Sequence, residues 1–260
     1  MTLFARCYLL VFCQLAAGGL LALAVPPFHD MARGYYKSSV GVFLSMLLVG
    51  AGGTFWLWLT RPLSGISPVE CVLWASFLLL CVGYMVTLWG EREAWRARLY
   101  AASLLAGLVA VAVAAAGLTP GHPVLGALDG ITGALLLGSV VNGMLIGHWY
   151  LVDPGLEIEP FQRAFKWFVG TLWAQILFLG VAFALLWPSE SVVLSQNLPI
   201  IGMRILLGPV AGLGMAALLG RVLAIPQTMA ATGLFYIATL AVLVGELLGR
   251  YVAFRTSLPL

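Results

Sequence analysis

Long apolar runs divide this chain, and they constrain its fold more than any other feature. Eight windows are each long enough for a membrane-spanning helix, which needs about 20 apolar residues. The windows cover residues 3–25, 38–60, 69–90, 99–118, 124–151, 164–187, 199–223 and 230–252. Hydrophobic residues make up 62% of the chain and charged residues only 9%, against roughly 25% charged residues in a soluble domain. We therefore predict an all-α, polytopic membrane protein, a bundle of about eight transmembrane helices.

Short polar or proline-containing breaks separate the windows. The longest of them, such as "PPFHDMARGYYK" and "VDPGLEIEPFQR", leave no room for a soluble domain, so we expect residues 1–260 to form a single transmembrane domain. The breaks after the first and fifth windows are similar in length, and each follows a glycine-rich window. A parallel four-plus-four repeat, with halves at 1–118 and 124–260, would explain that similarity.

Small residues recur at every fourth position of the fifth window. They are Gly126, Gly130, Ala134 and Gly138. This spacing allows the backbones of neighbouring helices to approach closely. We therefore expect the helices to pack into one compact bundle.

Basic residues are distributed unevenly between the two sides of the predicted bundle. The breaks after windows 1, 3, 5 and 7 carry Arg33, Lys37, Arg92, Arg96, Arg98, Arg163, Lys166 and Arg221, and the opposite side carries Arg6, Arg61, Arg250 and Arg255. Because an excess of lysine and arginine marks the cytoplasmic side, this distribution predicts that both termini lie on the outer side. The net charge of +3 is small and spread between apolar runs, so we expect no nucleic-acid partner.

Five charged residues fall inside the apolar windows at similar depths, near the predicted outer face. They are Glu70, Asp129, Arg204, Glu246 and Arg250. Charged groups inside spans are costly, and as a rule they are paired or functional. Two interpretations stay open: an ion-pair lock that positions the helices, and a proton-conducting or quinone-binding site. Glu246 and Arg250 are spaced for pairing along their own helix, which leaves Asp129 as the expected partner of Arg204 between helices.

A second candidate site lies at the opposite, cytoplasmic end of the fifth window, where "GHWYLVDP" leaves the apolar run. A neutral histidine can hydrogen-bond a quinone carbonyl and exchange its proton. His148 is therefore a candidate contact, with Trp149 and Tyr150 as an apolar wall for the head group. Asn142 and Gln14 are further quinone-binding candidates inside the spans. The alternative is that the two aromatic residues belong to the interfacial belt and that His148 bonds a loop carbonyl.

The sequence argues against a haem or metal centre in this chain. A transmembrane b-type haem usually needs two histidines that face each other from helices, whereas His29 follows Pro26-Pro27 in a break. No histidine or cysteine spacing matches a metal site, and the ligands for iron–sulfur clusters are lacking. We therefore expect the redox centres on partner subunits.

Two stretches are similar to the membrane anchor subunit of dimethyl sulfoxide reductase. "LLVFCQLAAGGLLALAV" (9–25) resembles the first span of that family, where a glutamine is followed closely by a glycine pair. "GELLGRYVAF" (245–254) resembles the Glu-x-x-Gly-Arg element of its last span. The matching residues are Gln14, Gly18, Gly19, Glu246, Gly249 and Arg250. These short stretches are a small part of the chain, and "GHWYLVDP" does not match the family.

The resemblance implies a haem-free, quinone-handling subunit of the bacterial cytoplasmic membrane, related more loosely to the polysulfide-reductase type of anchor. Such a subunit exchanges electrons between the quinone pool, menaquinone or ubiquinone, and an iron–sulfur or cytochrome partner. We therefore expect a membrane subunit of an oxidoreductase complex that has no catalytic centre of its own. Two alternatives stay open: a structural accessory subunit of a respiratory or photosynthetic complex, and a small proton-coupled transporter.

Overall fold

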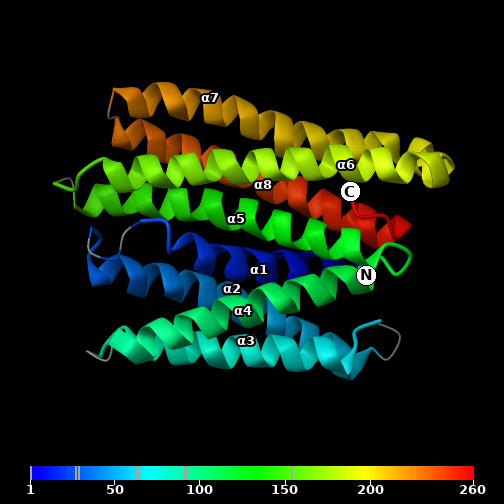
Figure 1. Cartoon of the computed structure of the whole chain (residues 1–260), viewed down its shortest axis with the longest axis horizontal. Coiled ribbons are helices and arrows are strands. Elements are labelled where there is room, and N and C mark those ends of the chain that lie inside the picture. Colours follow the sequence, from blue (N-terminus) through cyan, green and yellow to red (C-terminus); the bar gives the residue numbers. More distant parts are fainter. Residues whose placement is uncertain are drawn as a thin grey trace.

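The computed structural model describes residues 2–26, 28, 30–61, 65–90, 93–153, 155–225 and 227–260. Over these residues the chain is helical and contains no strand (Figure 1). The helices are α1 (Thr2–Ala22), α2 (Arg33–Thr60), α3 (Pro68–Thr87), α4 (Glu93–Leu118), α5 (Pro123–Val152), α6 (Glu159–Ile205), the π-helix η1 (Leu206–Val210), α7 (Ala211–Ala224) and α8 (Thr228–Thr256). The prediction of an all-helical chain is confirmed.

Seven helical runs in the described part of the chain are long and apolar enough to cross a membrane, which corrects the expected count of about eight. The difference arises in Glu159–Ala224, one continuous run of 66 residues where the sequence pattern predicts two spans. The polar break "PSESVVLSQNLP" is helical, and only Glu190 within it departs from helical geometry, with φ −118° and ψ 16°. Proline removes one backbone hydrogen bond but has a helical φ, so Pro188 and Pro199 interrupt the apolar pattern without ending the helix.

The 66-residue run folds back on itself at Glu190. A straight helix of that length would extend about 100 Å, roughly three times the hydrocarbon thickness of a bilayer. Packing between its two parts is antiparallel: Gly212 lies against Leu172, and Gly220, further along the chain, lies against Phe165, further back. In Figure 1, α6 reaches one end of the bundle and α7 returns beside it. We call the part before Glu190 the first arm of this hairpin and the part after it the return arm.

Helices α1 and α5 pack against each other in the middle of the bundle (Figure 1). Gly18 and Gly138 lie where the two helices cross. A Cβ atom on Gly18 would overlap the backbone carbonyl of Ala134, and one on Gly138 would overlap the backbone of Gly18. The small residues spaced along α5 therefore allow direct backbone contact, as this pattern does in other membrane helices.

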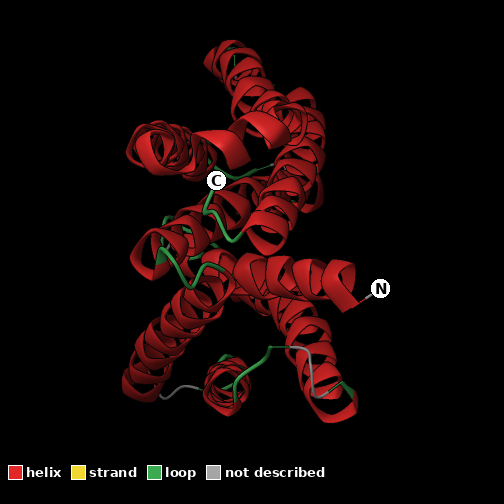
Figure 2. Ribbon diagram, turned by 90° about the vertical axis from the view of Figure 1, so that its right-hand side faces the viewer, coloured by secondary structure: helices red, strands yellow, loops and turns green. Residues whose placement is uncertain are grey.

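Both termini lie at one end of the bundle (Figure 1), and Figure 2 looks onto that end. The helix axes are inclined to one another rather than parallel (Figure 2). The start of α5 and the turn at Glu190 lie at this same end, whereas α5 ends near His148 at the opposite one. Which side of the membrane each end faces stays a prediction.

Candidate functional site

Two carboxylates and two guanidinium groups form one buried cluster between three helical segments. Asp129 lies on α5 and Arg204 on the return arm. Glu246 and Arg250 lie one turn apart on α8. Each of the four side chains has at most 4% of its surface exposed. We call these four residues the charge network.

Each guanidinium contacts both carboxylates. Nη2 of Arg204 lies 3.0 Å from Oδ1 of Asp129 and 3.7 Å from Oε1 of Glu246. Nη2 of Arg250 lies 2.6 Å from Oδ2 of Asp129 and 3.4 Å from Oε2 of Glu246. The two pairs expected from the sequence are present, and the structure joins them to each other. Because the formal charges cancel, mutual attraction offsets much of the cost of removing them from water.

Glycines leave room for the charged side chains. A Cβ atom on Gly249 of α8 would overlap Nη1 of Arg204. A Cβ atom on Gly133 of α5 would overlap the carboxylate of Glu246. Because these two positions have no side chain, Arg204 and Glu246 can reach their partners in the charge network.

The return arm contains a π-helical turn next to Arg204. This turn, η1, spans Leu206–Val210 and includes Pro209. Proline lacks the N–H that an α-helix would bond to a carbonyl one turn back, and a π-turn accommodates that loss. Gly208 within the turn lies against Gly245 of α8, so the two backbones come together beside the charge network.

Two buried glutamines extend the charge network toward the first arm and α1. Nε2 of Gln175 donates to Oε1 of Glu246 at 3.2 Å. Nε2 of Gln14 donates to a backbone carbonyl of α5 at 2.8 Å, and this amide also lies beside Gly133. The structure therefore places Gln14 next to the charge network and not next to His148. Sequence reasoning missed Gln175, although an amide inside an apolar span was an available signal.

Several polar atoms of this region have no hydrogen-bond partner among the described residues. Besides Oδ2 of Asp129, which Arg250 contacts in an ion pair, they are Oε1 of Gln14, Oε1 of Gln175, Nη1 of Arg204 and Nε of Arg250. A buried donor or acceptor that stays unpaired costs free energy. These two acceptors and two donors are therefore the atoms through which the region can bind water or a ligand.

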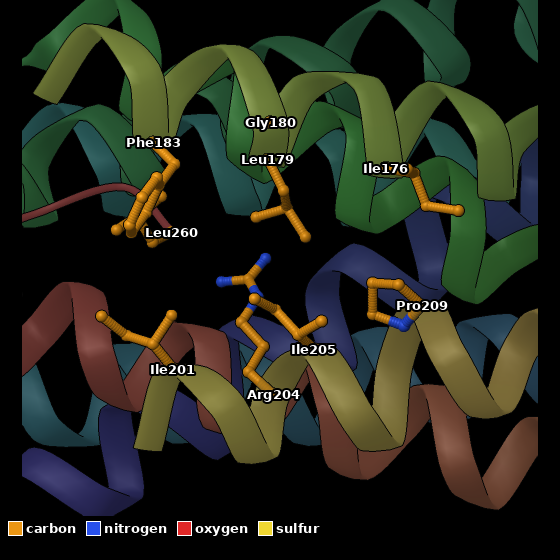
Figure 3. Close-up of a pocket in the computed structure, with 9 residues that line it drawn as sticks. All are labelled: Ile176, Leu179, Gly180, Phe183, Ile201, Arg204, Ile205, Pro209 and Leu260. Atoms are coloured by element: carbon orange, nitrogen blue, oxygen red, sulfur yellow. The ribbon is translucent and has the colours of Figure 1, made fainter. Parts of the chain in front are cut away.

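A cavity of about 280 Å³ opens between the two arms of the hairpin, beside the charge network (Figure 3). Its apolar walls are formed by Ile176, Leu179, Gly180, Phe183, Ile201, Ile205, Pro209 and Leu260. Among the described residues that line it, only Arg204 is charged. Figure 3 shows the guanidinium of Arg204 in the space between the arms. The cavity thus offers one firmly held cation to an otherwise apolar ligand.

Glu70, expected in the same layer of charges, pairs with Arg6 instead. Nη2 of Arg6 donates to Oε2 of Glu70 at 3.3 Å, and the indole of Trp74 reaches Oε1 at 3.5 Å. Helix α3, which carries Glu70, packs against α2 and α4. In Figure 1, α1 and α5 lie between α3 and α8. The structure therefore separates Glu70 from the charge network.

His148, Trp149 and Tyr150 do not form a common wall at the end of α5. His148 is exposed, whereas Tyr150 is buried against Phe161, with the ring centroids 5.3 Å apart. The hydroxyl of Tyr150 donates to a loop carbonyl. Trp149 packs edge-on against Tyr35 with the ring centroids 6.1 Å apart. The three side chains have different surroundings, and only His148 faces outward.

Asn142 joins the ends of two other helices. Its Oδ1 accepts a hydrogen bond from the hydroxyl of Tyr35 at 2.5 Å, and its Nδ2 donates to the carbonyl of Ala22 at 3.1 Å. Ala22 is the last residue of α1, where helix carbonyls lack partners within the helix. Asn142 is thereby bonded within the fold. His29, the other histidine considered for a haem, lies outside the described residues.

The charge network can orient an oxygen acceptor through Arg204 and can exchange protons through its two carboxylates. In the part of the chain that the structure describes, no group of three or more His, Cys, Asp or Glu side chains could hold a metal ion. Comparisons of the chain with models of protein families, with curated proteins and with solved structures give no match.

Proposed function

We propose that this chain is the quinone-interacting membrane subunit of a bacterial multi-subunit electron-transfer complex in the cytoplasmic membrane. It binds a quinone or quinol from the lipid phase. Electrons then pass between the quinone pool and a partner subunit that carries iron–sulfur clusters or haem. The observation that supports this proposal most directly is the position of Arg204. Its side chain lines the apolar cavity and forms ion pairs with Asp129 and Glu246.

A quinone combines an apolar ring and an isoprenoid tail with two carbonyl oxygens. The apolar walls of the cavity suit the ring, and a small number of polar groups then fixes its orientation. The guanidinium of Arg204, whose Nη1 has no hydrogen-bond partner among the described residues, can donate a hydrogen bond to one carbonyl. The volume of about 280 Å³ lies near the lower end of small-molecule sites. The head group would therefore fill the cavity while the tail extends into lipid.

Quinone chemistry couples electrons to protons. Oxidation of one quinol releases two electrons and two protons, and reduction of one quinone takes up the same number. The electrons go to or come from the redox centre of the partner subunit. Asp129 and Glu246 lie behind Arg204 and can exchange the protons. Gln175, which is bonded to Glu246, extends this polar path into the first arm.

A photoreactive azidoquinone tests where the quinone binds. The chain is purified from native membranes with its co-purifying subunits, placed in nanodiscs and illuminated with the probe, and labelled peptides are identified by mass spectrometry. We expect labels on both arms, around Leu179 and Ile205, and competition by unlabelled quinone. Labels around His148 alone would move the site to the other end of α5. Labelling that unlabelled quinone does not reduce would overturn the proposal.

Gly180→Leu and Gly170→Leu form a matched pair of variants on the first arm. Gly180 lines the cavity and Gly170 does not. Neither glycine has a described neighbour within 4 Å of its Cβ position. Leucine at position 180 fills the cavity without touching the charge network, so quinone labelling and quinol-dependent electron transfer should fall at least tenfold. The same substitution at position 170 should leave both unchanged.

A proton-coupled transporter is the second candidate, and η1 favours it. Transporter sites for ions and substrates are typically built on discontinuous helices, and η1 is a local irregularity beside Arg204 within a continuous helical run. Proteoliposomes that contain this chain alone and a trapped pH-sensitive dye test it. Substrate-driven proton movement that Glu246→Gln abolishes would support transport. If the proteoliposomes show no proton movement and the azidoquinone does not label the chain, a structural accessory role would remain.

A further inference from the structure

Two adjoining cavities lie at the end of the bundle opposite to the turn at Glu190, where α2 and α4 begin and α3 ends. Their volumes are about 390 and 320 Å³. They share Phe28, Glu93 and Arg96 as lining residues. We call the two cavities together the end cavity. It shares no lining residue with the cavity at Arg204 and is independent of quinone binding there.

Among the described residues, two arginines line the end cavity. Arg33 is the first residue of α2, and Arg96 lies in the first turn of α4. Nη2 of Arg96 donates to the carbonyl of Gly90 at 2.8 Å. Its Nε is buried and has no hydrogen-bond partner within the described ranges. Glu93 is the acidic residue of the lining, so the described charges that line the end cavity favour an anion.

The hydroxyl of Tyr84 is a second unpaired group in the end cavity. Tyr84 is 0% exposed and lines the cavity, yet its hydroxyl has no partner among the residues that the structure describes. The hydroxyl of the neighbouring Tyr100, in contrast, donates to the carbonyl of Leu20 at 2.6 Å. Since an unpaired buried hydroxyl costs free energy, Tyr84 marks a position where a ligand oxygen would be stabilised.

Aromatic rings form one wall of the end cavity. Phe28 stacks on Tyr36, with the ring centroids 4.7 Å apart, and meets Tyr100 edge-on at 6.1 Å. The lining of the end cavity therefore combines charged groups with an aromatic surface. A ligand that fits it has both an anionic and an apolar part.

Two tryptophans indicate that this end of the bundle lies at the level of the lipid head groups. Nζ of Lys37 lies 4.8 Å from the ring centroid of Trp89, and Cζ of Arg98 lies 5.7 Å from that of Trp95. Tryptophan is enriched at membrane–water interfaces, where basic side chains accompany it. The end cavity therefore faces the depth at which phospholipid phosphates lie.

We propose that the end cavity binds the head group of an anionic glycerophospholipid. Its phosphodiester contacts Arg33 and Arg96, and a head-group or glycerol oxygen accepts a hydrogen bond from Tyr84. Basic pockets between transmembrane helices are the typical sites for anionic lipids. Beside the charged lining, Phe28 exposes 50% of its surface, and Trp89, which follows the lining residue Leu88, exposes 61%, so that the two rings present an apolar face. This apolar face suits acyl chains, which a free phosphate ion does not have.

Native mass spectrometry of the full chain tests this proposal. The protein is released from nanodiscs that contain equal amounts of phosphatidylglycerol and phosphatidylcholine, and the retained lipids are counted. We expect retention of phosphatidylglycerol at least tenfold above that of phosphatidylcholine. Equal retention of the two lipids would overturn the proposal. Displacement of the bound lipid by millimolar glycerol phosphate would also overturn it, because the site would then belong to a free anion.

Arg96→Gln and Arg98→Gln are matched variants on α4, since each removes one cation and only Arg96 lines the end cavity. We expect Arg96→Gln to lower phosphatidylglycerol retention about fivefold, in line with the typical contribution of one basic residue near anionic lipid, and Arg98→Gln to leave it unchanged. Equal losses in the two variants would contradict a specific site. Tyr84→Phe removes only the hydroxyl and should lower retention severalfold. If Arg96→Gln does not fold, Tyr84→Phe serves as the test of the lipid site. Full retention of phosphatidylglycerol in Tyr84→Phe would then overturn the proposal.

Discussion

Gly249 of α8 lies directly against the guanidinium of Arg204 on the return arm. Because position 249 has no side chain, Arg204 can reach across the interface and place Nη2 3.0 Å from Oδ1 of Asp129. The charge network therefore depends on a residue that carries no charge.

Gly249→Ala is expected to destabilise the folded protein by about 1–3 kcal/mol, the usual cost of overpacking a well-packed interior. Gly202→Ala is the matched control, because Gly202 precedes Arg204 on the same arm and has no described neighbour within 4 Å of its Cβ position. Free energies of unfolding in mixed micelles measure both effects. Similar values for the two variants would mean that Arg204 can move aside without cost.

Asp129→Asn removes the carboxylate that both arginines share. The variant leaves two buried guanidiniums facing Glu246 alone, and breaking a buried ion pair in this way costs about 3–5 kcal/mol. Glu159→Gln breaks an exposed pair with Arg163, whose N–O distance is 2.7 Å, and should cost less than about 1 kcal/mol. Denaturant titration of both variants gives the comparison. A loss below about 1 kcal/mol for Asp129→Asn would show that the carboxylate is not needed to hold the arginines.

Gly18→Ala should disrupt the crossing of α1 and α5, because its Cβ atom would overlap the carbonyl of Ala134. We expect a loss of about 1–3 kcal/mol in unfolding free energy. Gly117→Ala on α4 is the control, with open space around the Cβ position among the described residues. Alanine favours helix over glycine by about 1 kcal/mol, so the control should be neutral or more stable. Thermal unfolding measures the stability of both variants. Equal stability would show that the backbones of α1 and α5 are not in close contact at Gly18.

Asn142→Ala is expected to lower the unfolding free energy by about 1–3 kcal/mol, because the buried hydroxyl of Tyr35 loses its acceptor and the carbonyl of Ala22 keeps only the N–H of Val25. Asn197→Ala removes only a local bond to the carbonyl of Val193 and should change stability by less than about 0.5 kcal/mol. Chemical unfolding followed by circular dichroism measures the difference. If the first variant is as stable as the second, Asn142 does not connect the helix ends.

Much of the fold could be predicted because bilayer thickness sets the length of an apolar helix. That rule places α1 and α8 close to their observed bounds. The connection around Glu190 differs from the prediction, because its polar residues and two prolines resemble a loop in the sequence but remain helical, so that one continuous run replaces two separate helices. Sequence analysis locates helix ends from residue types alone. In the structure, the chain reverses its direction at Glu190, and the residues on both sides of it are helical.

The candidate site could be predicted only in part, because depth in the membrane does not show which helices are neighbours. Asp129 and Arg204 share a depth and do meet. Glu70 is predicted to lie at the same depth, but α3 packs elsewhere and its carboxylate pairs with Arg6. The cavity at Arg204 depends on how the two arms close on each other, and no local pattern in the sequence encodes that closure.

The charge network also has a consequence for the order in which the chain is made. Asp129 precedes Arg204 by 75 residues and Arg250 by 121. During synthesis, the aspartate therefore enters the lipid phase before either cation has left the ribosome. Its neutralisation comes late, when the return arm and then α8 have been inserted. A nascent chain that stops before α8 therefore lacks Arg250, and its Asp129 can pair with Arg204 but not with a second guanidinium of the charge network.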